Sequence, residues 1–306
     1  MPLHIETPFV RSQFHSRRLQ KNVWLKMEAM QPTGSFKLRG VGAVCESQLA
    51  SGAQRLVSSS GGNAGIAVAY CGRELGVPVV VVVPESTSQR ARDLIRLEGA
   101  EMIVHGATWA EANDMAQSLN GPQCAFVHPF DDPVLWRGHA TMVDEIAVTG
   151  PKPDAVILAV GGGGLLCGVV EGLWRNDWSD VPIIAVETEG ADCYARSVAQ
   201  GRPVELSAIS SIATSLGAKR PCDKALEWTA KHVIRNVVVP DALAVAAALQ
   251  FLDEHRVVVE PACGAALAAL HLDHPTIASA SDIAVIVCGG VTASVDQLRA
   301  LATSIG

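Results

Sequence analysis

The chain lacks the features that would place it on a nucleic acid or in a membrane. Its 24 lysines and arginines are outnumbered by 31 aspartates and glutamates, so the formal net charge is −7 and no basic surface is expected. The longest apolar run, Val77–Val83, ends at Pro84 and is far too short to span a bilayer. No charged segment followed by an apolar core opens the chain, which argues against a secretory signal. We therefore expect a cytoplasmic protein with no nucleic-acid and no membrane partner.

Motifs for disulfides or structural metals are also missing. The eight cysteines are scattered along the chain, and no two of them form a C-x-x-C pair. Several lie inside apolar patterns, which is typical of buried thiols in a reducing compartment. The nine histidines are equally dispersed and show no ligand spacing. The sequence thus predicts no zinc site.

Apolar side chains are plentiful, at 49% of 306 residues, so a large core is expected. Short β-branched runs such as Val77–Val83 and Ala155–Val160 alternate with helical patterns such as Ala64–Leu75 and Ala242–His255. Asp241 is predicted to cap the last of these helices. The alternation predicts an α/β fold with parallel sheets covered on both faces. In such folds ligands bind at the carboxyl ends of the strands.

One lysine stands at the start of a predicted helix. Within the stretch 31–40, Pro32, Gly34 and Ser35 are turn and cap residues, so Lys37 falls in the first helical turn. Exposed N–H groups and the positive end of the helix dipole lower the pKa of an ammonium placed there. A lysine with a lowered pKa suits a Schiff-base enzyme, because only the free amine attacks an aldehyde. The bland alternative is an ordinary solvated lysine.

Two glycine-rich stretches, Ser58–Ala64 and Gly161–Leu165, each lie between a predicted strand and a predicted helix. Successive backbone N–H groups in such a loop form a nest for a carboxylate or a phosphate. The second loop also allows a dinucleotide interpretation, since Glu187 ends the next strand, where an acidic residue would hold a ribose. Leu166 and Cys167, however, stand where the G-x-G-x-x-G pattern needs glycine, so this alternative is the weaker one.

Taken together, four motifs resemble those of the fold-type II pyridoxal-phosphate (PLP) enzymes. They are Gly34-Ser35-Phe36-Lys37, Ser59-Ser60-Gly61-Gly62-Asn63-Ala64-Gly65, Gly161-Gly162-Gly163-Gly164-Leu165 and Val287-Cys288-Gly289-Gly290. The chain looks most like the L-serine/L-threonine dehydratases of the serine dehydratase and serine dehydratase-like type. The likeness runs from Thr7-Pro8 to the final helix.

The resemblance implies a tryptophan synthase β-like architecture. Two parallel-sheet α/β domains would hold the cofactor in the cleft between them. Residues 1–34 and 134–306 would form the large PLP-binding domain, and residues 35–133 the small inserted domain. A homodimer is the family expectation.

The resemblance also implies a role for each motif. Lys37 is the expected catalytic residue: it would bind the cofactor aldehyde as an imine and, once freed, remove the Cα proton of the substrate. The implied cofactor contacts are Phe36, Asn63, Gly161, Gly162, Gly163, Gly164, Leu165, Ser215 and Cys288. The substrate carboxylate would lie at Ser60, Gly61, Asn63 and Ala64. Phe36 and Ser215 would cover the two faces of the pyridine ring, and Cys288 would contact its nitrogen.

The resembling family also has a monovalent cation site near the phosphate loop. The matching positions are Gly161, Glu187, Ala191, Cys193, Leu216 and Ala218. Cys193 stands where an oxygen ligand is expected, and thiol sulfur is a poor partner for the hard K⁺ ion. The sequence therefore leaves K⁺ open as a second cofactor.

The implied reaction is β-elimination from L-serine and L-threonine, which gives pyruvate or 2-oxobutanoate plus ammonia. Racemases resembling this chain read S-S-G-N-H in the first loop and use the second serine as a base, but Gly61 offers no hydroxyl. Cysteine synthases read T-S-G-N-T-G there and are also a poorer match. Because many dehydratases have alanine at position 61, Gly61 is predicted to widen the pocket for a bulkier β-hydroxy amino acid. A PLP-binding sensor of low activity is the alternative from another class.

Overall fold

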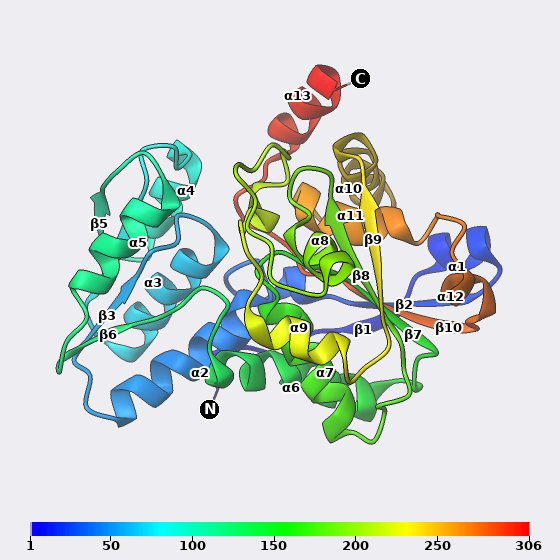
Figure 1. Cartoon of the computed structure of the whole chain (residues 1–306), viewed down its shortest axis with the longest axis horizontal. Helices are drawn as coiled ribbons and strands as arrows, with labels where there is room; N and C mark the ends of the chain where they lie inside the picture. Colours follow the sequence, from blue (N-terminus) through cyan, green and yellow to red (C-terminus); the bar gives the residue numbers. More distant parts are fainter. Residues whose placement is uncertain (1, 306) are drawn as a thin grey trace.

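The structure is a computed structural model that describes residues 2–305, and two separate sheets organise it (Figure 1). The larger sheet, in spatial order, consists of β1 (Phe9–Arg11), β2 (Asn22–Lys26), β10 (Asp282–Ile286), β7 (Ala155–Ala159), β8 (Ile183–Thr188) and β9 (Ile234–Val239). The smaller sheet consists of β5 (Glu101–Val104), β4 (Val79–Val83), β3 (Arg55–Ser58) and β6 (Cys124–Phe126). All neighbouring strands are parallel except β1 and β2, which are antiparallel.

The helices connect these strands. They are α1 (Gln13–Leu19), α2 (Lys37–Ala50), α3 (Asn63–Leu75), α4 (Gln89–Leu97), α5 (Trp109–Ser118), α6 (Pro133–Thr149), α7 (Gly164–Arg175), α8 (Cys193–Gln200), α9 (Asp223–Thr229), α10 (Asp241–His255), α11 (Pro261–Ala269), α12 (Pro275–Ser279) and α13 (Val295–Ile305). The small sheet lies within residues 55–126, whereas the large sheet takes strands from both sides of that segment. The α/β class is confirmed, and the domain boundaries at 34/35 and 133/134 stay predictions.

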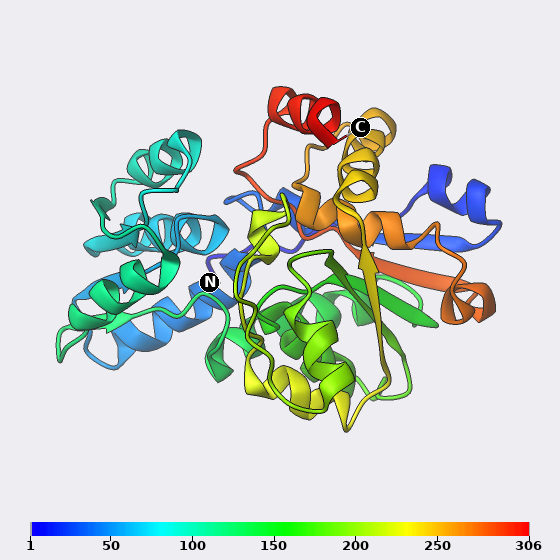
Figure 2. The ribbon, with the colours of Figure 1, turned by 45° about the horizontal axis from the view of Figure 1, so that its top comes forward.

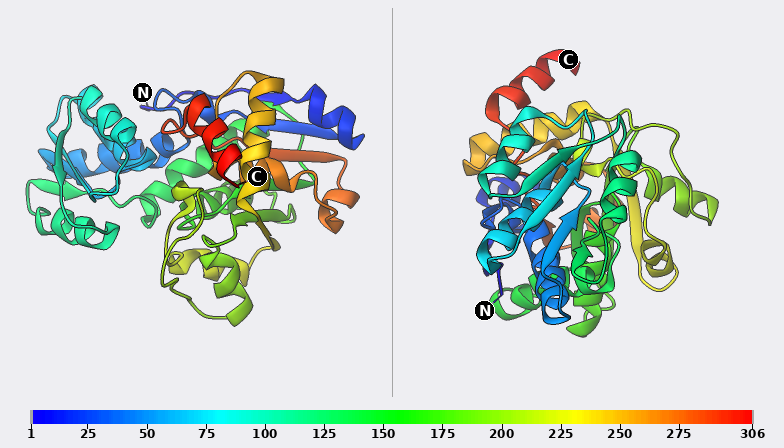
Figure 3. Two further views of the ribbon diagram at one scale, coloured as in Figure 1. Left: turned by 90° about the horizontal axis from the view of Figure 1, so that it is seen from above. Right: turned by 90° about the vertical axis from the view of Figure 1, so that its left-hand side faces the viewer.

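The valine run of β4 shows why the small sheet is covered on both faces. Side chains alternate along a strand, so Val80 and Val82 point to one face, where they pack with Ala112 and Ala116 of α5. The other valines of the strand belong to the main core on the α3 side. The right panel of Figure 3 looks onto this part of the molecule, with helices on either side of the strands.

The large sheet is covered in the same way. Helix α11 packs on β7, β8 and β9, and α10 packs outside α11. Helix α7 contacts β7 and carries α6 on its outer side. In Figure 2, α10 and α11 (gold to orange) lie above the sheet and α7 (green) lies below it. The loops that carry the predicted site lie at the carboxyl ends of the parallel strands in this sheet.

Two expectations about local structure need correction. The sequence patterns missed β1 and α1. Asp241 is not the cap of α10: Pro240 occupies the cap position, and the Asp241 carboxylate accepts hydrogen bonds from Ser211 Oγ at 2.6 Å and Ile212 N at 2.9 Å. The carboxylate therefore anchors the loop after α8 rather than the helix end. Within residues 2–305, no helix is long and apolar enough to cross a membrane.

Candidate active site

Lys37 is the first residue of α2, and backbone hydrogen bonds attach this helix start to the end of β10. The Phe36 N–H donates to the Cys288 carbonyl over 3.1 Å, and the Gly290 N–H donates to the Gly34 carbonyl over 2.8 Å. Two motifs that are about 250 residues apart in the sequence thus form one short ladder. This ladder brings Lys37 close to Cys288 at the end of β10.

The Lys37 amine is partly buried among protein atoms. Its Nζ donates to the carbonyl of Pro129 over 2.6 Å and lies 5.2 Å from the centre of the Phe36 ring. Burial lowers the pKa of Lys37 to about 8. The predicted lowering is therefore present, but burial is its main cause, whereas we had expected the helix terminus to cause it. The neighbouring His128 is also affected, since burial first and Lys37 second lower the pKa of its ring to about 4.

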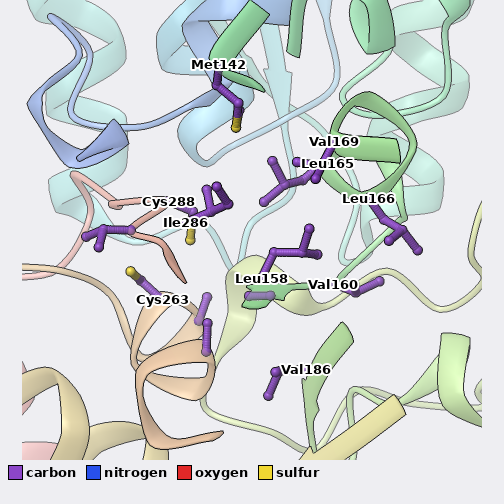
Figure 4. Packing of buried hydrophobic residues seen from close by; sticks show 14 of the residues in the cluster. Met142, Leu158, Val160, Leu165, Leu166, Val169, Val186, Cys263, Ile286 and Cys288 are labelled. Carbon is purple, nitrogen blue, oxygen red and sulfur yellow. The ribbon is translucent and has the colours of Figure 1, made fainter. Parts of the chain in front are cut away.

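Cys288 follows β10 inside the core, and Figure 4 shows it in the same buried cluster as Cys263 of α11 and Ile286 of β10. A hydrogen bond with the Cys263 thiol and burial both raise the pKa of Cys288 well above its ordinary value. The side chain is consequently a neutral thiol at physiological pH. It can make only a weak hydrogen bond to a ring nitrogen and cannot hold that nitrogen protonated.

The loop Gly161–Gly164 joins β7 to α7 at the carboxyl edge of the large sheet. Gly163 is the N-cap of α7, so the unpaired N–H groups of the first helical turn face this loop. The ring of Phe130 occupies the place where a Cβ on Gly162 would lie. A side chain at position 162 would therefore displace Phe130, which the sequence analysis did not identify. The position of the loop suits an anion nest, and phosphate binding there stays a prediction.

The loop Ser60–Ala64 joins β3 to α3 in the same manner. The Gly62 N–H donates to Ser60 Oγ over 3.3 Å, and Gly62 is the N-cap of α3. A Cβ on Gly61 would lie 2.5 Å from Thr87 Oγ1 and 2.8 Å from Thr87 Cγ2. The space of the missing methyl is thus filled by Thr87. Our expectation that Gly61 widens the pocket is wrong, because the threonine takes up the room.

Glu260, which we had not predicted, connects several of the expected residues. This carboxylate is 4% exposed and accepts hydrogen bonds from Asn63 Nδ2 at 3.0 Å and from the Thr292 N–H at 3.1 Å. It also accepts from the hydroxyls of Ser215 and Thr292. The other end of the Asn63 amide accepts from the Val291 N–H over 3.1 Å. A sequence signal exists: Glu260 is the only charged residue between Arg256 and His271.

The residues expected around a monovalent cation come partly together. The Cys193 thiol donates to the Gly161 carbonyl over 3.9 Å, and a Cβ on Gly161 would lie 3.3 Å from the Leu216 carbonyl oxygen. Glu187 is buried, and its two oxygens accept the N–H groups of Tyr194 at 2.9 Å and Ala195 at 2.6 Å. Burial raises the pKa of Glu187 to about 8 and that of Cys193 to about 12. Contacts of Ala191 and Ala218 with an ion stay predictions.

The remaining expected contacts lie close to Lys37. Phe36 packs against His139 with ring centres 4.8 Å apart, and its stacking on a cofactor ring stays a prediction.

Two residues after Lys37, the guanidinium of Arg39 is fully buried and binds both oxygens of Glu28, at 2.7 and 2.8 Å, and both of Glu145, at 2.6 Å each. This ion cluster, which the sequence patterns did not reveal, anchors the first turn of α2.

The site combines groups that can react with or bind a ligand. They are a partly buried amine, two glycine nests and a neutral thiol. The amine can react with an aldehyde, and each nest can hold an anionic group. The residues therefore fit a ligand that carries an aldehyde, a phosphate and a ring nitrogen, together with a second molecule that carries a carboxylate.

Comparison with known proteins gives the same result. Residues 1–289 match the family described as pyridoxal-phosphate dependent enzyme. The chain is 46% identical to the human protein named serine dehydratase-like, with 100% of this chain and 96% of that protein covered. It is 44% identical, with the same coverage, to human L-serine dehydratase/L-threonine deaminase. A crystal structure of L-serine ammonia-lyase from the fungus Rhizomucor miehei superposes with a TM-score of 0.94 at 38% identity and covers 99% of both chains.

Similarity of this extent, over the whole length of the chain, is found among related proteins. The chain belongs to the family of pyridoxal-phosphate dependent enzymes.

Proposed function

We propose that this protein is an ammonia-lyase that converts L-serine to pyruvate and L-threonine to 2-oxobutanoate, each with release of ammonia. The observation that carries the proposal is the Lys37 amine, whose pKa is lowered to about 8, at the end of β10 and next to Cys288. The full-length similarity to proteins named serine dehydratase and L-threonine deaminase supports the choice of substrates.

Each residue contributes a separate part of the reaction. Bound PLP supplies an electron-withdrawing ring that makes the Cα proton of the amino acid acidic. Lys37 would hold the cofactor and, as a free amine, would take that proton. The N–H groups of Ser60–Ala64 hold the substrate carboxylate, and those of the Gly161–Gly164 loop hold the cofactor phosphate. Because the Cys288 thiol is neutral, it leaves the ring a moderate electron sink, which is sufficient for loss of a β-hydroxyl.

The test combines product analysis with trapping of the lysine. The purified protein should release 2-oxo acid and ammonia from both substrates, and borohydride should attach a pyridoxyl group to Lys37, which mass spectrometry identifies. Lys37→Ala should remove both activities, whereas Lys231→Ala, which removes an exposed lysine, should leave them intact. A protein that carries PLP on Lys37 but releases no 2-oxo acid would instead be the low-activity sensor.

The proposal extends to K⁺ as a second cofactor. A cation beside Glu187 would stabilise the charged form of this buried carboxylate, whose pKa is raised to about 8. Cys193 offers only a neutral thiol, so we expect weak activation by K⁺ relative to Na⁺. Cys193→Ser replaces the thiol with an oxygen ligand and should increase the activation by K⁺. Equal rates in K⁺ and in tetramethylammonium, for both the wild type and Cys193→Ser, would exclude the ion.

The assembly and the compartment are part of the same proposal. A homodimer in the cytoplasm agrees with the family expectation and with eight thiols that are all free. Light scattering of the purified protein measures the assembly directly, and a monomer at enzyme-assay concentrations would contradict the dimer.

A further inference from the structure

Three histidines that the sequence shows as unrelated meet at the end of the large sheet remote from the small one. Helix α1 carries His15, α10 ends with Glu254 and His255, and His271 follows α11. His15, Glu254 and His255 each offer one nitrogen or oxygen atom, and these atoms lie within 4.8 Å of one another. Figure 1 shows α1 at the opposite end of the molecule from the small sheet. The expectation that all histidines stay dispersed is therefore wrong.

Each of the three side chains keeps one buried atom without a hydrogen-bond partner in the described chain. These atoms are His15 Nε2, Glu254 Oε2 and His255 Nδ1. Buried polar atoms without partners are rare in folded proteins, and three in one cluster need a common explanation. The His15 side chain is almost fully buried, at 3% exposure, so bulk water does not supply the missing partner. Because one ligand atom of each side chain lies within 4.8 Å of the others, a bound cation would give the three side chains a common partner.

The remaining polar atom of each side chain is held by a neighbour. His15 Nδ1 lies 3.3 Å from His271 Nε2, and His255 Nε2 lies 2.9 Å from Ser12 Oγ. Glu254 Oε1 accepts from Arg18 at 2.6 Å and from Gln250 at 2.7 Å. Metal-binding histidines and carboxylates are oriented by outer partners of this kind, which leave the other atom for the ion.

The proton positions agree with metal binding. Arg18 Nη1 lies 3.5 Å from His271 Nε2, and because arginine only donates, this nitrogen is an acceptor. With His15 Nδ1 assigned as the donor to this nitrogen over 3.3 Å, the lone pair of the His15 ring lies on its Nε2. The His255 ring also contacts the Phe251 carbonyl, and metal binding would replace that contact.

We propose that His15, Glu254 and His255 bind a divalent transition-metal ion of the zinc type, which braces α1 against the end of α10. Tetrahedral Zn²⁺ with ligands at about 2.0–2.2 Å puts its ligand atoms roughly 3.4 Å apart, so small side-chain rotations close the present spread. Two imidazoles select such an ion over Mg²⁺ or Ca²⁺, which prefer oxygen. A water molecule takes the fourth position. The positive charge of Arg18 repels the ion, and the negative charge of the Glu254 carboxylate offsets this repulsion.

The test uses the enzyme loaded with its cofactor and freed of metals by a chelator. Calorimetric titration with Zn²⁺ should give one ion per chain, and Zn²⁺ should raise the midpoint of thermal unfolding. Titration with Co²⁺ should produce the visible bands of nitrogen and oxygen ligands without a sulfur charge-transfer band. The absence of that band separates this site from the eight cysteines. Removal of a ligand should weaken binding at least about tenfold in His15→Gln, Glu254→Gln and His255→Gln.

His105→Gln is the matched control, because it removes an exposed histidine outside the cluster. It should bind Zn²⁺ as the wild type does. If His15→Gln fails to fold, Glu254→Gln and His255→Gln still decide the question, since both side chains are only partly buried. The proposal is overturned if the wild type shows no saturable site with one ion per chain. It is equally overturned if His255→Gln and Glu254→Gln bind with unchanged affinity.

Discussion

The amide nitrogen of Asn63 lies 3.0 Å from a carboxylate oxygen of Glu260, although 197 residues separate the two in the chain. Asn63 begins α3 beside the small sheet, whereas Glu260 is the N-cap residue of α11, which packs on the large sheet. The same carboxylate receives the hydroxyls of Ser215 and Thr292. One buried charge therefore connects the two parts of the molecule at the place where the cofactor is expected.

Glu260→Gln should weaken this connection strongly. Whichever oxygen the amide group replaces, its NH₂ will face one N–H group and one hydroxyl. The hydroxyl can turn and accept from the NH₂, but the hydrogen bond from the N–H group is lost. Hydrogen bonds to a charged group contribute about 1.5–3 kcal/mol each, so kcat/KM for L-serine should fall by about ten- to a hundredfold. Cofactor release, followed by absorbance, should become faster because Asn63 is no longer held.

Glu205→Gln is the control for that experiment, because it neutralises an exposed glutamate away from the site. It should leave kcat/KM and cofactor retention unchanged. Wild-type kinetics in Glu260→Gln would show that the carboxylate only fills space.

Gly61 and Thr87 should behave as a coupled pair. Gly61→Ala introduces a methyl 2.5 Å from Thr87 Oγ1, so the loop that holds the substrate carboxylate must shift. Overpacking of this kind costs about 1–3 kcal/mol, and we expect activity on L-serine and L-threonine to fall together. Thr87→Ala removes the clashing atoms, so the double variant should recover most of the activity. Additive losses in the double variant, measured against Thr87→Ala alone, would contradict this pairing.

The comparison of sequence and structure separates local from distant relationships. Lys37 and the two glycine loops were predictable, because a turn residue, a strand end and a helix start within about ten residues define each of them. Thr87 and Glu260 were not, because their importance comes from partners on other elements. A missing methyl at Gly61 suggested free space, and only the fold reveals which side chain occupies it.

The histidine cluster shows the same limit. Ligand spacing identifies metal sites when the ligands share a helix or a loop, but His15 and His255 are joined only after α1 has packed on α10. Similarly, Arg39 stands in a helical pattern that gives no sign of two carboxylates from other segments. Charges that are neutralised over long sequence distances leave no periodic signal.

The lowered pKa of Lys37 predicts how cofactor uptake depends on pH. With a pKa of about 8 the neutral amine makes up roughly a tenth of Lys37 at pH 7, against less than about a thousandth for an ordinary lysine. The rate of covalent PLP attachment to the cofactor-free protein should rise about tenfold per pH unit up to about pH 8 and then level off. Stopped-flow absorbance between pH 6.5 and 10 measures this rate. A rise that continues to pH 10 would mean that burial does not shift this amine.

Arg39 should matter for stability more than any exposed ion pair. Burial alone would lower the pKa of Arg39, but hydrogen bonds to Glu28 and Glu145 raise it above its ordinary value, so the guanidinium remains charged in the core. Arg39→Met removes one member of the cluster and leaves two carboxylates with Lys26 as their only nearby cation in the described chain. Breaking a buried pair from one side costs about 3–5 kcal/mol, which denaturant unfolding measures.

Arg73→Met is the matched control, because Arg73 pairs with Glu98 at 2.7 Å with about half of its side chain exposed. Exposed pairs of this kind contribute little, so its unfolding midpoint should stay near that of the wild type. In Arg39→Met the first turn of α2 loses its anchor two residues after Lys37, and cofactor retention should fall along with stability. If Arg39→Met unfolds at the same denaturant concentration as Arg73→Met, the buried cluster does not hold the lysine in place.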